Sequence, residues 1–220
     1  MSPVSHQAIK LALSAPRMGT YEAATNVAPA LTGAIALYTW NAQLSAALMY
    51  PLHVCEVAVR NAVSEAITQV YGPDWPWSAG FLSSLTNPPA PTYSPKRDLL
   101  HTGAAQPTTG KVIAELKFKF WETMFTGRFD ARLWNPHMRN VLPFIEPALT
   151  VQQARMRIRV DLESLRGLRN RIAHHEPIFA RSLANDLQKA HELIGFRCVH
   201  TAAWMHANES ASVLIAAKPP

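Results

Sequence analysis

The spacing of apolar residues between positions 52 and 71 constrains the fold more than any other feature. An α-helix completes a turn in about 3.6 residues, so side chains three and four positions apart lie on one face. The apolar side chains here recur at those steps: Leu52, Cys55, Val59, Val63, Ile67 and Val70. The two-residue alternation of a half-buried strand persists nowhere. The sequence therefore predicts an all-α protein, a helical bundle that forms one domain over residues 1–220.

Prolines and glycines divide the chain into predicted helices. Pro51 is predicted to open a new helix, because proline is tolerated in a first turn. Seven prolines fall within residues 72–110, which predicts an irregular insertion. The tail, residues 210–220, is predicted to be frayed. The predicted helices cover about residues 1–15, 30–49, 52–71, 111–125, 132–141, 151–175, 182–194 and 197–209.

The segment between Glu22 and Glu56 contains no charged residue. Polar residues and Pro51 interrupt it at close intervals, so no run of about 18 to 20 apolar residues survives. A buried central helix is therefore predicted rather than a membrane span. The first ten residues lack the basic start and apolar run of a signal peptide. Cys55 and Cys198 are too far apart in sequence for a cysteine zinc motif, and free thiols in a reducing cytoplasm are expected.

Arginines are concentrated near the C-terminal third of a basic chain, whose formal net charge is +6. From Arg155 to Arg171 the sequence has six arginines and only two acidic residues. Arginine without lysine favours phosphate recognition, so an RNA partner is predicted. The alternative is a solvated helix face that keeps the protein soluble. The candidate RNA-binding residues are Arg155, Arg159, Arg166, Arg171 and His175.

The run from Arg169 to His174 combines the groups needed to cut RNA. An imidazole can take a proton from a ribose 2′-OH, and a guanidinium can grip a phosphate through two donors. Arg169, Asn170 and His174 are therefore the candidate catalytic residues. On a straight helix Arg169 and His174 lie about 140° apart, so either the helix breaks or the cleft wraps around it. The alternative is a basic helix end whose histidines satisfy the last carbonyls.

No metal site and no cofactor are predicted. His174, His175 and Glu176 are metal-ligand types, but adjacent side chains on a helix diverge by about 100°. Glu56 and Arg60 lie four residues apart on an apolar helix, and a structural ion pair is the favoured interpretation. The alternative is that Glu56 or Asn61 orients Arg169.

The run Arg169-Asn170-x3-His174 resembles the Arg-x4-His signature of HEPN-domain ribonucleases. Other segments resemble the Abi-like (abortive infection) branch: residues 38–44, 52–62, 71–77 and 111–121. In some HEPN toxins a tyrosine that is a target of inactivating nucleotidylation lies two positions after the histidine, where this chain has Glu176.

The resemblance implies a HEPN-like bundle that acts as a homodimer with both motifs in a shared cleft. It implies a metal-independent endoribonuclease, a toxin or antiviral effector, that is controlled by an antitoxin or regulatory protein. The alternative is a non-catalytic module that binds RNA or a protein partner.

Overall fold

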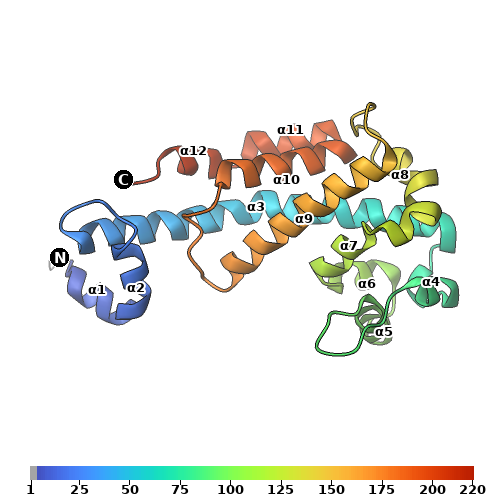
Figure 1. Cartoon of the computed structure of the whole chain (residues 1–220), viewed down its shortest axis with the longest axis horizontal. Coiled ribbons are helices and arrows are strands. Elements are labelled where there is room, and N and C mark those ends of the chain that lie inside the picture. The colour runs from blue at the N-terminus through green and yellow to red at the C-terminus, as the bar shows by residue number, and fades with distance from the viewer. Residues whose placement is uncertain (1–3) are drawn as a thin grey trace.

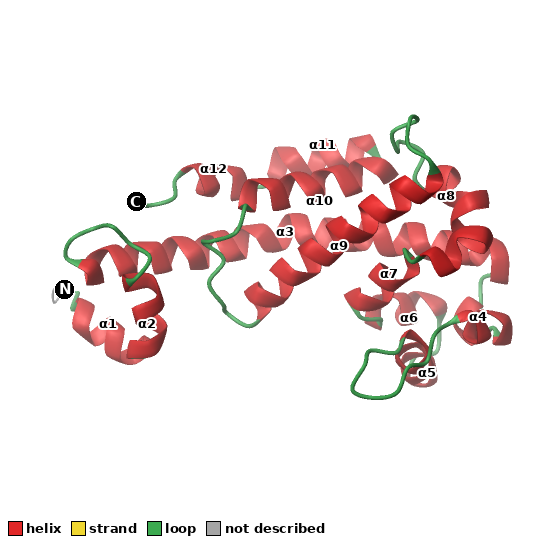
Figure 2. Ribbon diagram, in the orientation of Figure 1, coloured by secondary structure: helices red, strands yellow, loops and turns green. Residues whose placement is uncertain are grey.

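The computed structural model describes residues 4–220, and this part of the chain is helical without a strand (Figure 2). The all-α prediction is therefore confirmed. Residues 1–3 of the helix that is predicted over residues 1–15 lie outside the described part of the chain. Three short 3-10 or π turns accompany the helices: η1 (Trp75–Trp77), η2 (Gly127–Phe129) and η3 (Asp130–Trp134). The helices are α1 (His6–Leu13), α2 (Ala15–Glu22), α3 (Ala30–Tyr71), α4 (Ala79–Ser84), α5 (Pro95–Ala105), α6 (Thr109–Glu115), α7 (Phe118–Met124), α8 (Asn135–Val141), α9 (Val151–Ala173), α10 (Leu183–Arg197), α11 (Val199–Asn208) and α12 (Ala211–Ala216).

The 42-residue helix α3 runs the length of the molecule, and most of the other helices pack along it, whereas α4 and α5 pack against η1 (Figure 1). The predicted break at Pro51 is wrong, because α3 continues through this residue. A proline inside a helix removes one backbone hydrogen bond and costs about 3 kcal/mol. Pro51 lies in the buried face beside Leu48 and Leu52, and packing on both sides of it offsets that cost.

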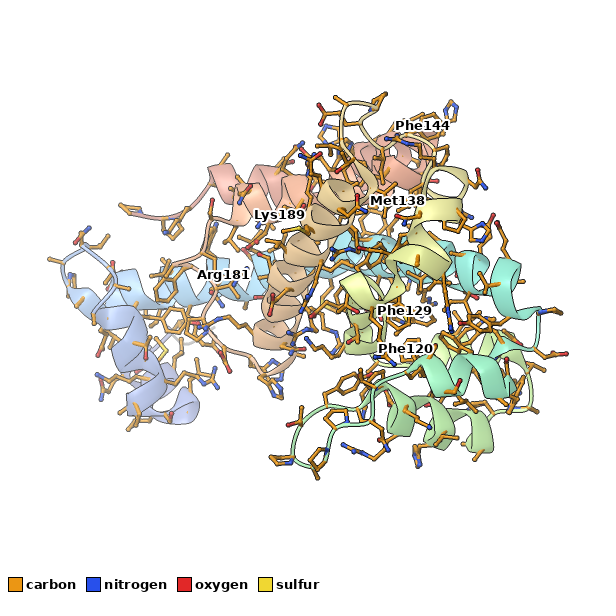
Figure 3. The ribbon with its side chains drawn as sticks, turned by 45° about the vertical axis from the view of Figure 1, so that its right-hand side comes forward. Phe120, Phe129, Met138, Phe144, Arg181 and Lys189 are labelled. Carbon is orange, nitrogen blue, oxygen red and sulfur yellow. The ribbon has the colours of Figure 1, made fainter. Side chains whose placement is uncertain are left out.

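Helix α9 crosses α3, and α10 packs against both. Polar side chains join α9 to α10 and to the residues just before it: Lys189 donates to the Ser164 hydroxyl at 3.2 Å, and Arg181 donates to the Ser164 carbonyl at 3.3 Å. Figure 3 shows Arg181 and Lys189 beside α9. Desolvation raises the pKa of Asp161 on the same surface, while Lys189 lowers it. These contacts hold the C-terminal half of α9 in a defined position.

The prediction of an irregular segment over residues 72–110 is wrong, because α4, α5 and the start of α6 lie there. Prolines interrupt helices in their interior but suit a first turn, and Pro95 occupies the first turn of α5. Hydroxyl side chains of Ser78, Ser94 and Thr108 cap the three helices. Trp75 is fully buried and stacks on Phe120, which anchors the segment to the core. Downstream, one predicted helix over residues 111–125 is instead divided into α6 and α7.

The prediction of a frayed tail is also wrong. Residues 211–216 form α12, in which Ala211 is buried. The Trp40 indole donates to the Leu214 carbonyl at 2.6 Å, and Lys218 donates to the Phe179 carbonyl at 3.0 Å. Such contacts between distant segments leave no local signal in the tail sequence.

Helix α3 is long and apolar enough by composition to cross a membrane. Its most apolar 18-residue window has a mean hydropathy of 1.2, and 39% of that window is buried within the protein. Core helices of soluble proteins share this composition, so the predicted absence of a membrane span stays a prediction.

Candidate functional site

The C-terminal end of α9 holds the Arg169–His174 run in a well-defined geometry. The helix ends at Ala173, and the His174 amide still donates to the Asn170 carbonyl at 2.9 Å. His175 has a φ of 54°, and its amide donates to the Ile172 carbonyl at 3.0 Å. The Glu176 amide donates to the Arg171 carbonyl at 2.8 Å, which completes a Schellman motif. The predicted break therefore follows His174 and does not separate it from Arg169.

The loop after α9 is tied to three other elements. Arg171 donates to the Pro177 carbonyl through Nε at 3.0 Å and Nη2 at 2.8 Å, and it lies 3.4 Å from Glu176. Arg17 on α2 donates to the His175 carbonyl at 2.7 Å. Inside the protein, the Ile178 amide donates to Asn41 Oδ1 at 2.8 Å. Arg171, predicted to bind RNA, therefore holds this loop with most of its donors.

Arg169 lies in a cavity of about 210 Å³ between α9 and α3. The cavity contains an unusual set of charged side chains, because Glu56, Arg60 and His53 also line it. The Arg60 Nε atom is buried without a hydrogen-bond partner, and Arg169 forms no ion pair with any residue in 4–220. Two guanidiniums facing one cavity are suited to an anion such as phosphate.

The structure changes the predicted role of Glu56 and Arg60. The expected ion pair between them is absent from the described residues 4–220. Both instead line the cavity that holds Arg169, whereas Asn61 lines a neighbouring one. Of the two residues predicted to orient Arg169, Glu56 thus lines its cavity and Asn61 does not, and no ion pair joins Glu56 to Arg169 within residues 4–220.

His174 does not join Arg169 in this cavity. It is exposed at the end of α9, and the helix directs the two side chains about 140° apart. His175 and Glu176 line a separate cavity of about 300 Å³ with Tyr21, Tyr38 and Asn41. The two cavities meet at Met49, which lines both. One copy of the chain therefore presents Arg169 and the two histidines on different sides of α9.

Two predicted RNA-binding arginines lie in ion pairs with carboxylates, and one of them is buried and the other half-buried. Arg155 is 8% exposed, donates to the Phe125 carbonyl at 3.2 Å and lies 2.6 Å from Asp130, without hydrogen-bond alignment to that carboxylate. Arg166 pairs with Glu122, whose carboxylate is buried and also receives Lys119. Their spacing in the sequence suggested a phosphate-binding surface, but the buried Glu122 on α7 and the half-buried Asp130 in η3 form ion pairs with these arginines. Arg159, by contrast, is exposed.

Replacing Arg166 by methionine is expected to lower the free energy of unfolding by about 3 kcal/mol, because it removes one partner of a buried carboxylate. Urea unfolding followed by circular dichroism measures the change. Arg159→Met is the matched control and should change stability by less than about 0.5 kcal/mol. If the Arg166 variant had wild-type stability and bound RNA more weakly, Arg166 would be an RNA-binding residue, as the sequence predicts.

Sequence reasoning missed His53, the one imidazole that shares a cavity with Arg169. A signal was present, because His53, Glu56 and Arg60 lie at steps of three and four residues and so share a helix face. Within residues 4–220, no group of three His, Cys, Asp or Glu side chains is arranged to hold a metal ion. Comparisons with protein-family models, with curated proteins and with solved structures found no match to this chain.

Proposed function

We propose that this protein is a metal-independent endoribonuclease of the Abi-like HEPN kind, a toxin or antiviral effector. One observation carries the proposal: Arg169 and Arg60 line one cavity, and neither guanidinium forms an ion pair with any residue in 4–220. Two such guanidiniums favour an anionic ligand. The phosphate of an RNA would suit this cavity and the basic charge of the chain, and His53 lines the same cavity.

In the proposed reaction, the ribose 2′-oxygen attacks the adjacent phosphorus. A bond forms from O2′ to phosphorus, and the bond from phosphorus to O5′ breaks. An imidazole accepts the 2′-OH proton, and the leaving 5′-oxygen gains a proton, which gives a 2′,3′-cyclic phosphate and a 5′-hydroxyl. Arg169 and Arg60 stabilise the charge that accumulates on the phosphorane, and Asn170 orients the phosphate. His174 is assigned the proton transfer, and the position of His53 makes it the competing candidate.

The proposed site needs a second copy of the chain, because Arg169 and His174 lie on different sides of α9 in one copy. A face of α3 is suited to this contact: Ala42, Ala46 and Met49 are exposed on it at steps of four and three residues. Small side chains allow two helices to approach closely, and Met49 borders the Arg169 cavity. A homodimer that meets on this face would bring two Arg169–His174 runs to one cleft.

Ala46→Glu is expected to convert a dimer into a monomer at micromolar concentration, because two buried carboxylates would face each other across the interface. Sedimentation velocity measures the change, and RNA cleavage should fall with dimer content. The control is Ala12→Glu on α1, also an exposed helical alanine, which should remain dimeric. A wild-type monomer with full cleavage activity would contradict the shared cleft.

The second candidate is an RNA-binding or partner-binding module that does not cut. The exposed position of His174, outside the Arg169 cavity, favours it. Incubation of RNA with the purified protein in EDTA, followed by analysis of the RNA ends, separates the two functions. If the wild-type protein produces RNA with cyclic phosphate ends and the His174→Ala variant does not, the result supports the ribonuclease. Intact RNA bound by the wild-type protein supports the module.

A further inference from the structure

A larger cavity adjoins the Arg169 cavity. It has a volume of about 590 Å³ and lies between α3 and the α10–α11 corner. His53 and Val57 line both cavities, so the two cavities share a wall on α3. The walls of the larger cavity are mostly apolar, and they include Val54, Ala58 and Ile194. A charged cavity and an apolar one therefore lie next to each other, with His53 between them.

An indole ring forms one wall of the larger cavity. Trp204 is 54% exposed, which is unusual for so large an apolar side chain. The edge of Tyr50 supports it, with ring centroids 5.8 Å apart and an interplanar angle of 73°. The Tyr50 hydroxyl is buried without a hydrogen-bond partner among residues 4–220, and Asn61 and Thr201 also line the cavity. The cavity thus offers a flat aromatic surface together with hydrogen-bonding groups.

We propose that this cavity is the nucleobase subsite of the RNA site, with one nucleotide spanning both cavities. The base stacks on Trp204 and hydrogen-bonds to Asn61, the ribose lies beside His53, and the phosphate lies between Arg60 and Arg169. The inference rests on RNA as the ligand of the proposed function. The charges support this orientation of the nucleotide, with its phosphate at Arg169. Arg197 in the apolar cavity is paired with Glu65, whereas Arg169 has no ion-pair partner within residues 4–220.

Every base has a π face, so the subsite should accept bases by stacking as well as by hydrogen bonding. Stacking of one base on an aromatic side chain contributes enough to change affinity about tenfold. Trp204→Ala should therefore weaken binding of a single-stranded hexanucleotide about tenfold, and Trp204→Phe should restore most of it. Trp77→Ala removes another exposed indole, one that lies at η1 against Gly103, and should leave binding unchanged.

Cys198 provides a test in the unmodified protein. Its thiol lines the apolar cavity at the start of α11, where hydrogen bonding from Thr201 holds the pKa of the thiol below its usual value. The other cysteine, Cys55, is fully buried, and burial raises the pKa of its thiol. Iodoacetamide should therefore label Cys198 selectively, and the labelling rate reports whether the cavity is occupied.

The probe is a 2′-O-methyl hexanucleotide, which cannot be cleaved because its 2′-oxygens are blocked. At ten times its dissociation constant it should slow the labelling of Cys198 about tenfold, whereas pyrophosphate at matched ionic strength should not. Unchanged labelling with bound hexanucleotide, or equal protection by pyrophosphate, would overturn the subsite. If ordinary RNA were cleaved but the hexanucleotide did not protect Cys198, the proposed ribonuclease function would stand and the nucleobase subsite would be rejected. Protection without cleavage of ordinary RNA would support the subsite and reject the ribonuclease.

Discussion

Replacing Arg169 by lysine is expected to slow RNA cleavage about a hundredfold while it leaves RNA affinity nearly unchanged. Lysine keeps the charge but cannot present two parallel donors to a phosphate. Loss of one such transition-state contact costs about 3 kcal/mol, which corresponds to a hundredfold in rate. Arg169 is exposed and forms no ion pair within residues 4–220, so stability should stay at the wild-type level.

Single-turnover cleavage and equilibrium binding are measured in parallel for this variant. Arg159→Lys serves as the matched control, because Arg159 is an exposed arginine on the same helix but does not line the Arg169 cavity. It should retain both rate and affinity. If Arg169→Lys weakened binding and cleavage by the same factor, Arg169 would contact the phosphate as strongly in the ground state as in the transition state. That result would favour the binding module over the ribonuclease.

His174→Ala is expected to reduce cleavage by about a hundredfold to ten-thousandfold, the range for loss of a general acid or base. The fold should not change, because His174 contributes to the helix end through its backbone amide, which alanine retains. The helical circular dichroism and melting temperature should therefore match those of the wild-type protein. End-group analysis of the RNA confirms that any residual cleavage is the same reaction.

Two further histidine variants identify which imidazole transfers the proton. His175→Gly is a clean control, because glycine is the residue most suited to the left-handed conformation at this helix end. It removes the ring and keeps the cap, and it should slow cleavage far less than His174→Ala, because His175 is a candidate for binding RNA and not for proton transfer. His53→Ala places a good helix former at an exposed position of α3. If His53→Ala abolished cleavage and His174→Ala did not, proton transfer would belong to His53 in the Arg169 cavity.

Local patterns predicted the helices well where the apolar spacing was regular. The predicted helix over residues 151–175 corresponds closely to α9, and the periodic segment 52–71 lies within α3. Prolines misled the prediction in two ways, at Pro51 inside α3 and within residues 72–110. In both places, packing decided the outcome: Pro51 is buried in a helix face, and Trp75 anchors the segment that follows α3.

The spacing of residues along the chain was enough to predict the helical class of the protein and the position of the Arg169–His174 run at a helix end. The charges that are available to a ligand became known only from the packing of distant helices. Arg155 and Arg166 looked like Arg169 in the sequence, yet the carboxylates of Asp130 and Glu122 neutralise them. Whether an arginine meets a carboxylate or an open cavity depends on which distant helix packs against it, and residue spacing along one helix does not contain that information.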